Sequence, residues 1–257
     1  MQTGGRPMRE VGRPAPGMPA ITHPPPAEPY RPLERLGYAV VALLTANVVL
    51  DVAAVIADLS LLDLVERVRE GASVTLEEAD QVESSQGTIE RLQGAAFILA
   101  AIPFFAWFRR AYRNLGGLGV QRLRYKPGWA IGGWFVPVLG LVRPKQITND
   151  IWRATAPGQP ARLDAPPQHK RPGPIVQLWW GLFLLSGLLY QSGSGALDAP
   201  TLGELRYRSQ ATLWADVTSA LAGVFAILVV RAITIRQQLR SAIVGAAPRE
   251  PDMEEIA

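Results

Sequence analysis

The sequence predicts an all-α membrane protein with four transmembrane helices and a short re-entrant or interfacial segment between the second and third of them. Two observations carry this prediction. Apolar residues gather in blocks long enough to cross a hydrocarbon layer about 30 Å thick, and charged residues lie between the blocks. The charges are also sorted by sign, because acids dominate one connecting segment and bases dominate two others. A chain of 257 residues is long enough for such a bundle.

Both ends of the chain are predicted to be disordered. Residues 1–35 hold nine prolines and four glycines but few large apolar side chains. Such a segment buries too little surface to offset the entropy lost on ordering. The last residues, 241–257, form a short acidic tail. The membrane domain is therefore expected over residues 36–240.

Four apolar blocks have the length and the scarcity of charge that a membrane-spanning helix needs. They lie at about residues 36–59, 92–108, 175–191 and 211–235. Helices are required because lipid offers no hydrogen-bond partner to backbone amides and carbonyls. None of the blocks shows the alternation of a membrane β-strand.

A fifth apolar stretch, residues 129–142, is too short for a full crossing. Its fourteen residues include a proline and three glycines, and as a helix they would extend roughly 21 Å. That length falls short of the hydrocarbon layer. We therefore predict that this stretch dips into one face of the membrane and returns.

The charge distribution predicts the orientation. Residues 60–91 carry eight acids and three bases, whereas residues 109–128 carry six bases and no acid. Residues 143–174 carry six bases and two acids. Lys and Arg next to membrane spans mark the cytoplasmic side. The sequence therefore predicts a multi-pass protein of the inner membrane with both termini in the cytoplasm.

The basic block after the second span is one candidate interaction site. It comprises Arg109, Arg110, Arg113, Arg122, Arg124 and Lys126. Bases near a membrane surface attract anionic lipid headgroups, at about 1 kcal/mol per residue. The alternative is that the block only sets the topology. Nothing resembling a nucleic-acid-binding module accompanies it, so no nucleic acid partner is expected.

A motif of aromatic, proline and polar residues surrounds this block. It consists of Trp107, Arg110, Asn114, Pro127, Trp129, Trp134, Phe135, Pro137, Pro144 and Trp152. On these residues the chain resembles actinobacterial membrane proteins that carry domain of unknown function 4328. The resemblance is dense over residues 104–153 and extends as a pattern of spans to about residue 240. It implies a multi-span membrane protein and brings no known activity with it.

Two acidic residues fall inside predicted spans. Asp51 lies in the first span and Asp216 in the fourth, at a similar depth towards the acidic side. An intramembrane carboxylate is costly and marks a functional-site hypothesis. We predict that both line one polar pocket, with Asn47 one turn below Asp51. The alternative for Asp51 is a hydrogen bond that only joins two helices.

Composition argues against metal, cofactor and enzyme chemistry. The chain has no cysteine and two histidines, and no catalytic set of residues stands out. We therefore expect no cofactor, no metal site and no enzymatic activity. The leading hypothesis is a membrane protein whose cytoplasmic face contacts lipid headgroups or a protein partner. The alternative is a small transporter or channel component that uses Asp51, which with only four spans would require a homo-oligomer.

Overall fold

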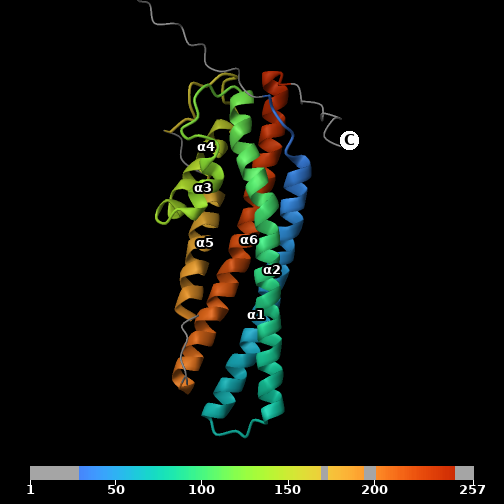
Figure 1. Ribbon diagram of the computed structural model, residues 1–257, viewed down its shortest axis with the longest axis vertical. Helices are drawn as coiled ribbons and strands as arrows, with labels where there is room; N and C mark the ends of the chain where they lie inside the picture. Colours follow the sequence, from blue (N-terminus) through green and yellow to red (C-terminus); the bar gives the residue numbers. More distant parts are fainter. Residues whose placement is uncertain (1–28, 169–172, 194–200, 247–257) are drawn as a thin grey trace, which may run out of the picture.

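The computed structural model describes residues 29–168, 173–193 and 201–246, and within these ranges it is all-α. The four long helices are α1 (Glu34–Arg69), α2 (Leu76–Gly117), α5 (Pro174–Gly193) and α6 (Leu202–Val244). Between α2 and α5 lie α3 (Trp129–Phe135), the 3-10 turn η1 (Leu139–Leu141) and α4 (Arg143–Ala154). Figure 1 shows these short elements beside one end of the bundle.

All four long helices are long and apolar enough to cross a membrane, which confirms the predicted fold class. Three of them are much longer than the predicted spans, because α1, α2 and α6 contain 36, 42 and 43 residues. At 1.5 Å per residue they measure about 54, 63 and 65 Å, roughly twice the thickness of a hydrocarbon layer. The predicted bounds therefore mark only the apolar part of each helix.

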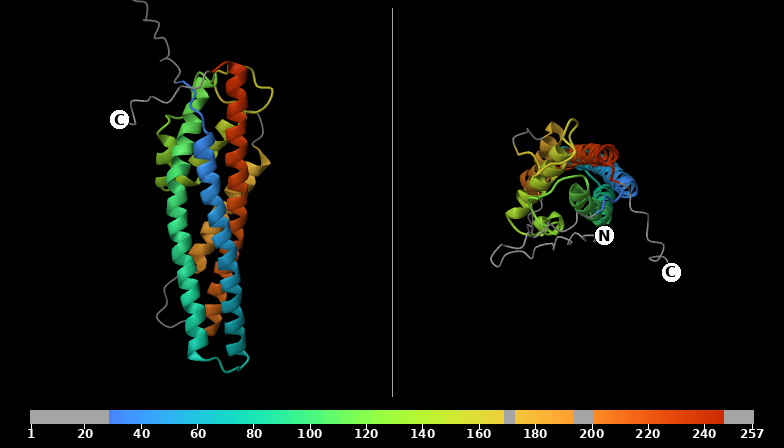
Figure 2. Two further views of the ribbon diagram at one scale, coloured as in Figure 1. Left: turned by 90° about the vertical axis from the view of Figure 1, so that its right-hand side faces the viewer. Right: turned by 90° about the horizontal axis from the view of Figure 1, so that it is seen from above.

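Helix α6 is the centre of the bundle, because it packs against both α1 and α5, while α2 packs mainly on α1. Figure 2 shows α1, α2 and α6 running side by side along the length of the molecule. Two glycines permit close contact between α1 and α6. A Cβ atom at Gly223 would lie 2.6 Å from Val48, and one at Gly37 would lie 2.9 Å from the hydroxyl of Thr234. Small residues at a helix crossing are typical of membrane bundles.

The prediction of disorder over residues 1–35 is wrong for its last seven residues. Tyr30 and Leu33 are 2% and 0% exposed, and α1 already begins at Glu34. The apolar side chains of Tyr30 and Leu33 provide the burial that the rest of the tail lacks. At the other end, α6 continues to Val244, into the predicted acidic tail. Residues 1–28 and 247–257 lie outside the described residues.

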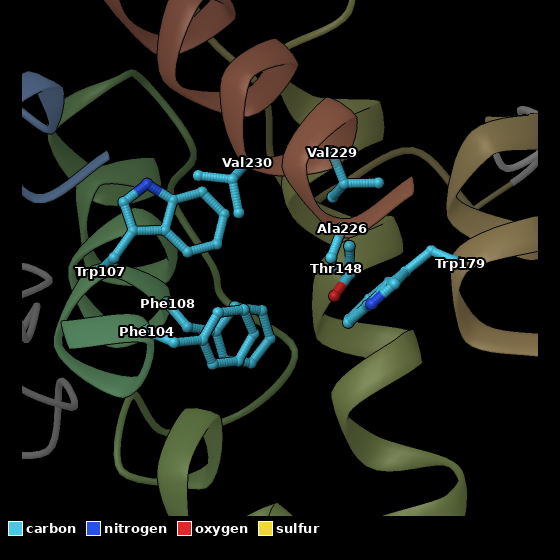
Figure 3. Close-up of a pocket in the computed structure, with 8 residues that line it drawn as sticks. All are labelled: Phe104, Trp107, Phe108, Thr148, Trp179, Ala226, Val229 and Val230. Atoms are coloured by element: carbon cyan, nitrogen blue, oxygen red, sulfur yellow. The ribbon is translucent and has the colours of Figure 1, made fainter. Parts of the chain in front are cut away.

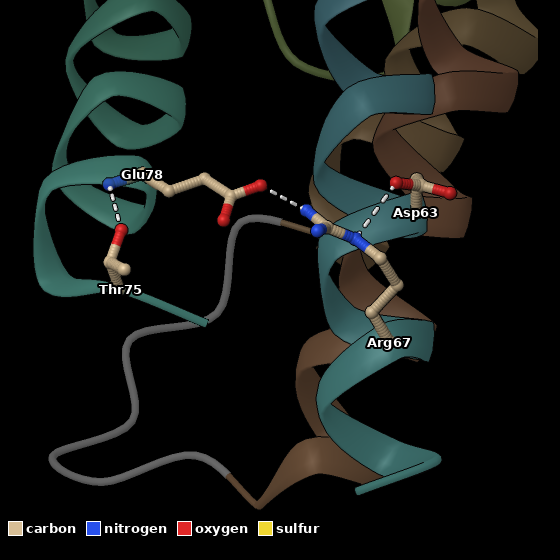
Figure 4. A network of polar contacts seen from close by, with 4 residues as sticks. All are labelled: Asp63, Arg67, Thr75 and Glu78. Carbon is tan, nitrogen blue, oxygen red and sulfur yellow. Dashed lines mark hydrogen bonds and ion pairs between the residues drawn. The ribbon is translucent and has the colours of Figure 1, made fainter. Parts of the chain in front are cut away.

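We name the two ends of the bundle by their charge. The acidic end is formed by residues 51–93 and 202–216, and the basic end by the C-terminal turns of α2 and α6, the short elements and the start of α5. Exposed polar pairs join α1 to α2 at the acidic end (Figure 4). Arg67 pairs with Asp63 on its own helix and with Glu78 on α2. Thr75 caps α2 by accepting a hydrogen bond from the Glu78 backbone N–H at 3.2 Å. Such exposed pairs contribute little stability.

Candidate functional site

The motif residues at the C-terminal end of α2 point into the core. Trp107 is 1% exposed, and its Nε1–H donates to the Thr234 hydroxyl of α6 over 3.1 Å. Asn114 is 2% exposed and donates through Nδ2 to Gln237 Oε1 at 2.9 Å and to the Arg31 carbonyl at 2.8 Å. The Arg31 backbone N–H donates back to Asn114 Oδ1 at 3.1 Å. These two motif residues therefore hold α2, α6 and the N-terminal segment together, and they are not part of an accessible face.

An aromatic cluster fills the space between α2 and α5 at the basic end. The ring centroid of Trp134 lies 5.7 Å from those of Phe104 and Trp180 and 5.9 Å from that of Phe183. Figure 3 shows the neighbouring apolar pocket, lined by Phe104, Trp107, Phe108, Thr148, Trp179, Ala226, Val229 and Val230. Its free volume is about 10 Å³, at the lower limit for one water molecule. This pocket is a packing defect in the core and has no room for an organic ligand.

Arginine side chains cover several aromatic residues of the motif. The Arg143 guanidinium lies 4.1 Å from the ring centroid of Tyr125 and 4.9 Å from that of Trp129. The Arg236 guanidinium lies 3.6 Å from the ring of Trp152. Such cation–π contacts stabilise partly desolvated cations. Trp129 and Trp152 are half-buried, and their rings contact arginine side chains of the same chain.

Two of the three prolines of the motif begin helical segments. Pro127 precedes α3 and is half-buried, and its carbonyl accepts a hydrogen bond from the Ala130 backbone N–H at 3.2 Å. Pro144 lies in the first turn of α4, a position that suits its missing N–H. Helix α4 buries Ile147, Ile151 and Ala154, the face that its spacing of four and three residues predicts.

The segment between α3 and α4 ends in an exposed apolar tip. The tip residues are Phe135, Val136, Val138, Leu141 and Val142, all of them at least 40% exposed. Val138 has a φ of 65° and a ψ of −48°. The Leu139 N–H donates to the Pro137 carbonyl over 2.7 Å, so residues 137–139 form a γ-turn of the rare type. A β-branched residue in this conformation is strained, and such strain persists where the surroundings enforce it.

The cations of the basic block are accessible to different degrees. Arg109, Arg122, Arg124 and Lys126 are exposed, whereas Arg110 and Arg113 are half-buried. Arg110 donates to the Pro32 carbonyl at 3.4 Å. The loop that carries Arg122 is fixed, because the backbone N–H of Arg122 donates to the Asp164 carbonyl at 2.9 Å. The structure therefore places four exposed cations of the block around the basic end.

Gly119 and Arg240 explain why this loop has a fixed path. Gly119 has a φ of 91°, and a Cβ atom there would lie 2.0 Å from the Ala161 carbonyl oxygen. Arg240 of α6 is 5% exposed and donates to the carbonyls of Leu118, Pro160 and Ala161 at 2.8, 3.0 and 3.3 Å. The sequence analysis missed Arg240 because it lies beyond the last predicted span.

Asp150 is a buried carboxyl group at the basic end. It is 0% exposed, and its Oδ1 accepts a hydrogen bond from Gln168 Nε2 at 3.2 Å. Burial raises its pKa above the ordinary value, while the Gln168 hydrogen bond and the cations Arg124 and Arg153 oppose this shift. The cations that surround it limit the cost of the buried charge.

At the acidic end the structure brings Asp51 and Asp216 together. Gln93 of α2 donates through Nε2 to Asp51 Oδ1 and to Asp216 Oδ1, both at 3.0 Å. One amide thus bridges a carboxyl group on α1 and another on α6. Asn47 is directed elsewhere, because its Nδ2 donates to backbone carbonyls of Leu43 at 2.8 Å and Ala96 at 3.2 Å.

Sequence reasoning missed two further members of this acidic cluster, Asp58 and Gln86. Asp58 is 3% exposed, and its Oδ1 accepts a hydrogen bond from Gln86 Nε2 at 3.0 Å. The signal was present in the spacing, because Asp51 and Asp58 are seven residues apart on α1 and Gln86 and Gln93 are seven apart on α2. A spacing of seven returns to the same helix face. Two antiparallel helices thus pair two acids with two amides.

The described residues contain no group of three or more His, Asp or Glu side chains that could hold a metal ion. The residues that the structure does bring together are carboxyl groups paired with amides at one end, and cations beside an apolar tip at the other.

Four long apolar helices, joined by buried polar contacts, define a helical membrane protein. The chain belongs to the family described as "Domain of unknown function (DUF4328)", whose sequence model matches residues 67–235. The match includes every motif residue from Trp107 to Trp152, and all of α1 except its last three residues lies before it. No curated protein and no solved structure matches this chain.

Proposed function

We propose that the basic end faces the cytoplasm of an inner membrane, as the distribution of Lys and Arg predicts, and binds anionic lipid headgroups. The observation that carries this proposal is the exposed apolar tip beside the exposed cations. Phe135 at the tip packs against Phe105 of α2, with ring centroids 5.6 Å apart. Phe105 lies four residues before Arg109, which is about 6 Å along the helix. A tip at the depth of Phe105 would enter the lipid while Arg109 stays at headgroup level.

The tip is suited to insertion. Its γ-turn at Val138 presents apolar side chains without a flexible glycine at the turn, so little entropy is lost when lipid surrounds it. The anchoring ring of Trp134 lies between α2 and α5. In this proposal the segment is re-entrant, the protein is not an enzyme, and both termini lie on the cytoplasmic side.

Lipid binding is tested in nanodiscs that contain neutral lipid alone or neutral and anionic lipid together. We expect anionic lipid to raise the melting temperature of the wild type, and the double variant Arg109→Gln, Arg122→Gln to lose most of that gain. The matched control is Arg69→Gln, Arg91→Gln, which removes two exposed bases at the acidic end. An equal loss in both double variants would show that net charge alone matters. Retention of a protein by the basic end, with no response to lipid, would favour a protein partner instead.

The depth and sidedness of the tip are tested with single cysteines, since the chain has none of its own. A fluorophore at Val138→Cys should be quenched by lipid-borne quenchers and not by aqueous ones, while one at Arg162→Cys should behave in the opposite way. In intact cells, Glu83→Cys should react with an impermeant reagent and Arg162→Cys should react only after lysis. Reaction of Arg162→Cys in intact cells would overturn the proposed orientation.

The acidic cluster supports a second candidate function, a transporter or channel component formed by a homo-oligomer. Its support is the pair Asp51 and Asp216 bridged by Gln93 inside the apolar part of the bundle. Flux into proteoliposomes that falls in Asp51→Asn and persists in the exposed control Glu83→Gln would favour this function. Flux that is indifferent to Asp51→Asn would reject it.

A further inference from the structure

The acidic cluster gathers three carboxyl groups in the core between α1, α2 and α6. Asp51 and Asp58 are 7% and 3% exposed, and Asp216 is half-buried beside them. The carboxyl groups of Asp58 and Asp216 lie within hydrogen-bonding reach of one another. This pair is therefore a direct carboxyl–carboxyl contact between the first and the last long helix.

The surroundings of this pair contain no neutralising cation among the described residues. The charged groups that face it are acids, Asp51 from α1 and Glu90 from α2, and the described salt bridges all involve other side chains. The remaining polar neighbours carry amide or hydroxyl groups: Gln86 and Gln93 from α2, Tyr190 from α5, and Thr212 from α6. Two buried carboxylates and a half-buried one, without a cation, would repel one another strongly in a medium of low dielectric constant.

One oxygen of the pair lacks a partner. Asp58 Oδ1 accepts from Gln86, but Asp58 Oδ2 is buried and has no donor within reach. Two carboxylate oxygens can share a hydrogen bond only if a proton lies between them. One proton between Asp58 and Asp216 would give the unpaired Asp58 oxygen a hydrogen-bond partner. Other pairs of adjacent carboxyl groups bind a proton in this way because both groups cannot ionise together.

The available space favours a proton over a metal or a hydrated cation. The cleft beside the pair is lined by Ala54, Ala57, Asp58, Gln86, Ile89, Glu90, Gln93, Tyr190, Thr212 and Asp216. Its free volume is about 20 Å³, enough for roughly one water molecule. A single water suffices to carry a proton to the pair, whereas a cation would need several oxygen ligands at short distance.

We propose that Asp58 and Asp216 form a proton-binding site at the acidic end of the bundle. One carboxylate takes a proton from hydronium, so that an O–H bond forms on the carboxyl group and water is released. The protonated carboxyl group donates to the other carboxylate and draws α1 towards α6. Loss of the proton leaves two adjacent carboxylates, which repel and loosen the acidic ends of α1, α2 and α6. This site is independent of the lipid-binding role proposed for the basic end, and it supplies a coupling proton if the protein transports a solute.

The test is infrared difference spectroscopy of the protein reconstituted in lipid, at a pH about 2 units above the pKa of an exposed carboxyl group. We expect the wild type to show the carbonyl stretching band of one protonated carboxyl group per chain. Both Asp58→Asn and Asp216→Asn should lose that band, because the remaining carboxylate can ionise and accept from the new amide. The control Glu83→Gln removes an exposed acid of α2 and should keep the band.

Three outcomes would overturn the proposal. The first is a wild type without a protonated carboxyl band at this pH. The second is a band that survives in both single variants, which would place the proton elsewhere. The third is a band that appears only when sodium and potassium ions are replaced by a large organic cation, which would make the pair a monovalent cation site. Melting curves of the variants check that each one is folded.

Discussion

The two ends of the bundle solve the problem of buried polar groups in different ways. At the basic end, Trp107, Asn114 and Arg240 are nearly fully buried and each donates to defined acceptors on other elements. At the acidic end, the buried carboxyl groups of Asp51 and Asp58 each accept from one amide, that of Gln93 and that of Gln86, and Asp58 Oδ2 has no donor. A buried polar group with partners stabilises the fold, and one without a partner costs free energy. At the basic end Asp150 Oδ2 is also buried without a donor, but the cations Arg124 and Arg153 lie near this carboxyl group, whereas the charged neighbours of Asp58 are the acids Asp216 and Glu90. The two ends therefore differ in the charges that surround a buried carboxyl group.

The largest effect is expected from Trp107→Ala at the basic end. The change removes a side chain that is 1% exposed and leaves the Thr234 hydroxyl without its donor. Truncation of a buried aromatic residue costs about 3–5 kcal/mol of unfolding free energy. Reversible unfolding in mixed micelles measures this loss. The control Trp214→Ala, at a residue 58% exposed, should cost far less, and equal losses would contradict the assignment of Trp107 to the core.

Asn114→Ala should cost less than the loss of Trp107 but more than any surface change. It deprives Gln237 Oε1 and the Arg31 backbone of their partners. Leaving buried polar groups unpaired costs about 1–3 kcal/mol. A double-mutant cycle with Gln237→Ala should give a coupling energy clearly different from zero. Strict additivity would show that the contact between α2 and α6 is not energetically coupled.

Asp58→Asn at the acidic end is expected to act in the opposite direction. At alkaline pH the new amide can donate to Asp216, which replaces a repulsion by a hydrogen bond worth about 1 kcal/mol. The melting temperature of this variant should therefore exceed that of the wild type at alkaline pH and approach it under acidic conditions. If the variant is less stable than the wild type at every pH, then removing this carboxyl group does not relieve a repulsion, and the acidic end does not differ from the basic end in this respect.

Asp150→Asn should change the pH dependence of stability at the basic end. Burial raises the pKa of Asp150 above its ordinary value of 3.8, so the folded chain keeps this proton to higher pH than the unfolded chain does. The contribution of Asp150 to the stability of the fold is therefore complete below its pKa in the unfolded chain, and it is lost as the pH rises through its pKa in the folded chain. When the free energy of unfolding is measured across this pH range, it should decline less in the variant than in the wild type. An unchanged slope would mean that the Arg124 and Arg153 charges already cancel the effect of burial.

The smallest effect is expected from Arg67→Gln at the acidic end. Its partners Asp63 and Glu78 are 71% and 40% exposed, and solvent screens such pairs. The melting temperature should stay within experimental error at physiological salt. A clear loss would show that the pairs in Figure 4, and not the packing of α1 against α2, hold the ends of these two helices together.

Much of the fold follows from local properties of the sequence. The lengths of the apolar blocks predict four spans, and Pro144 and the spacing of Ile147, Ile151 and Ala154 predict α4. The helix ends outside the membrane are less predictable. Residues 76–91 and 202–210 are polar, yet they continue α2 and α6, with Thr75 and Thr201 as helix caps. The search for apolar blocks ignored these extensions because hydropathy reports burial in lipid and not helicity.

By itself the sequence determined the class of protein, the number of spans and the presence of costly acids within them, because length, hydropathy and charge are local quantities. Only the tertiary structure decided which motif residues are core and which are surface. Trp107 and Phe135 belong to the same motif, yet one is 1% and the other 70% exposed. The tertiary structure also decided that Gln93 bridges Asp51 and Asp216, and that Asp58 meets Asp216 across 158 residues of chain. The physical reason is that such contacts depend on how antiparallel helices align, which no single helix encodes.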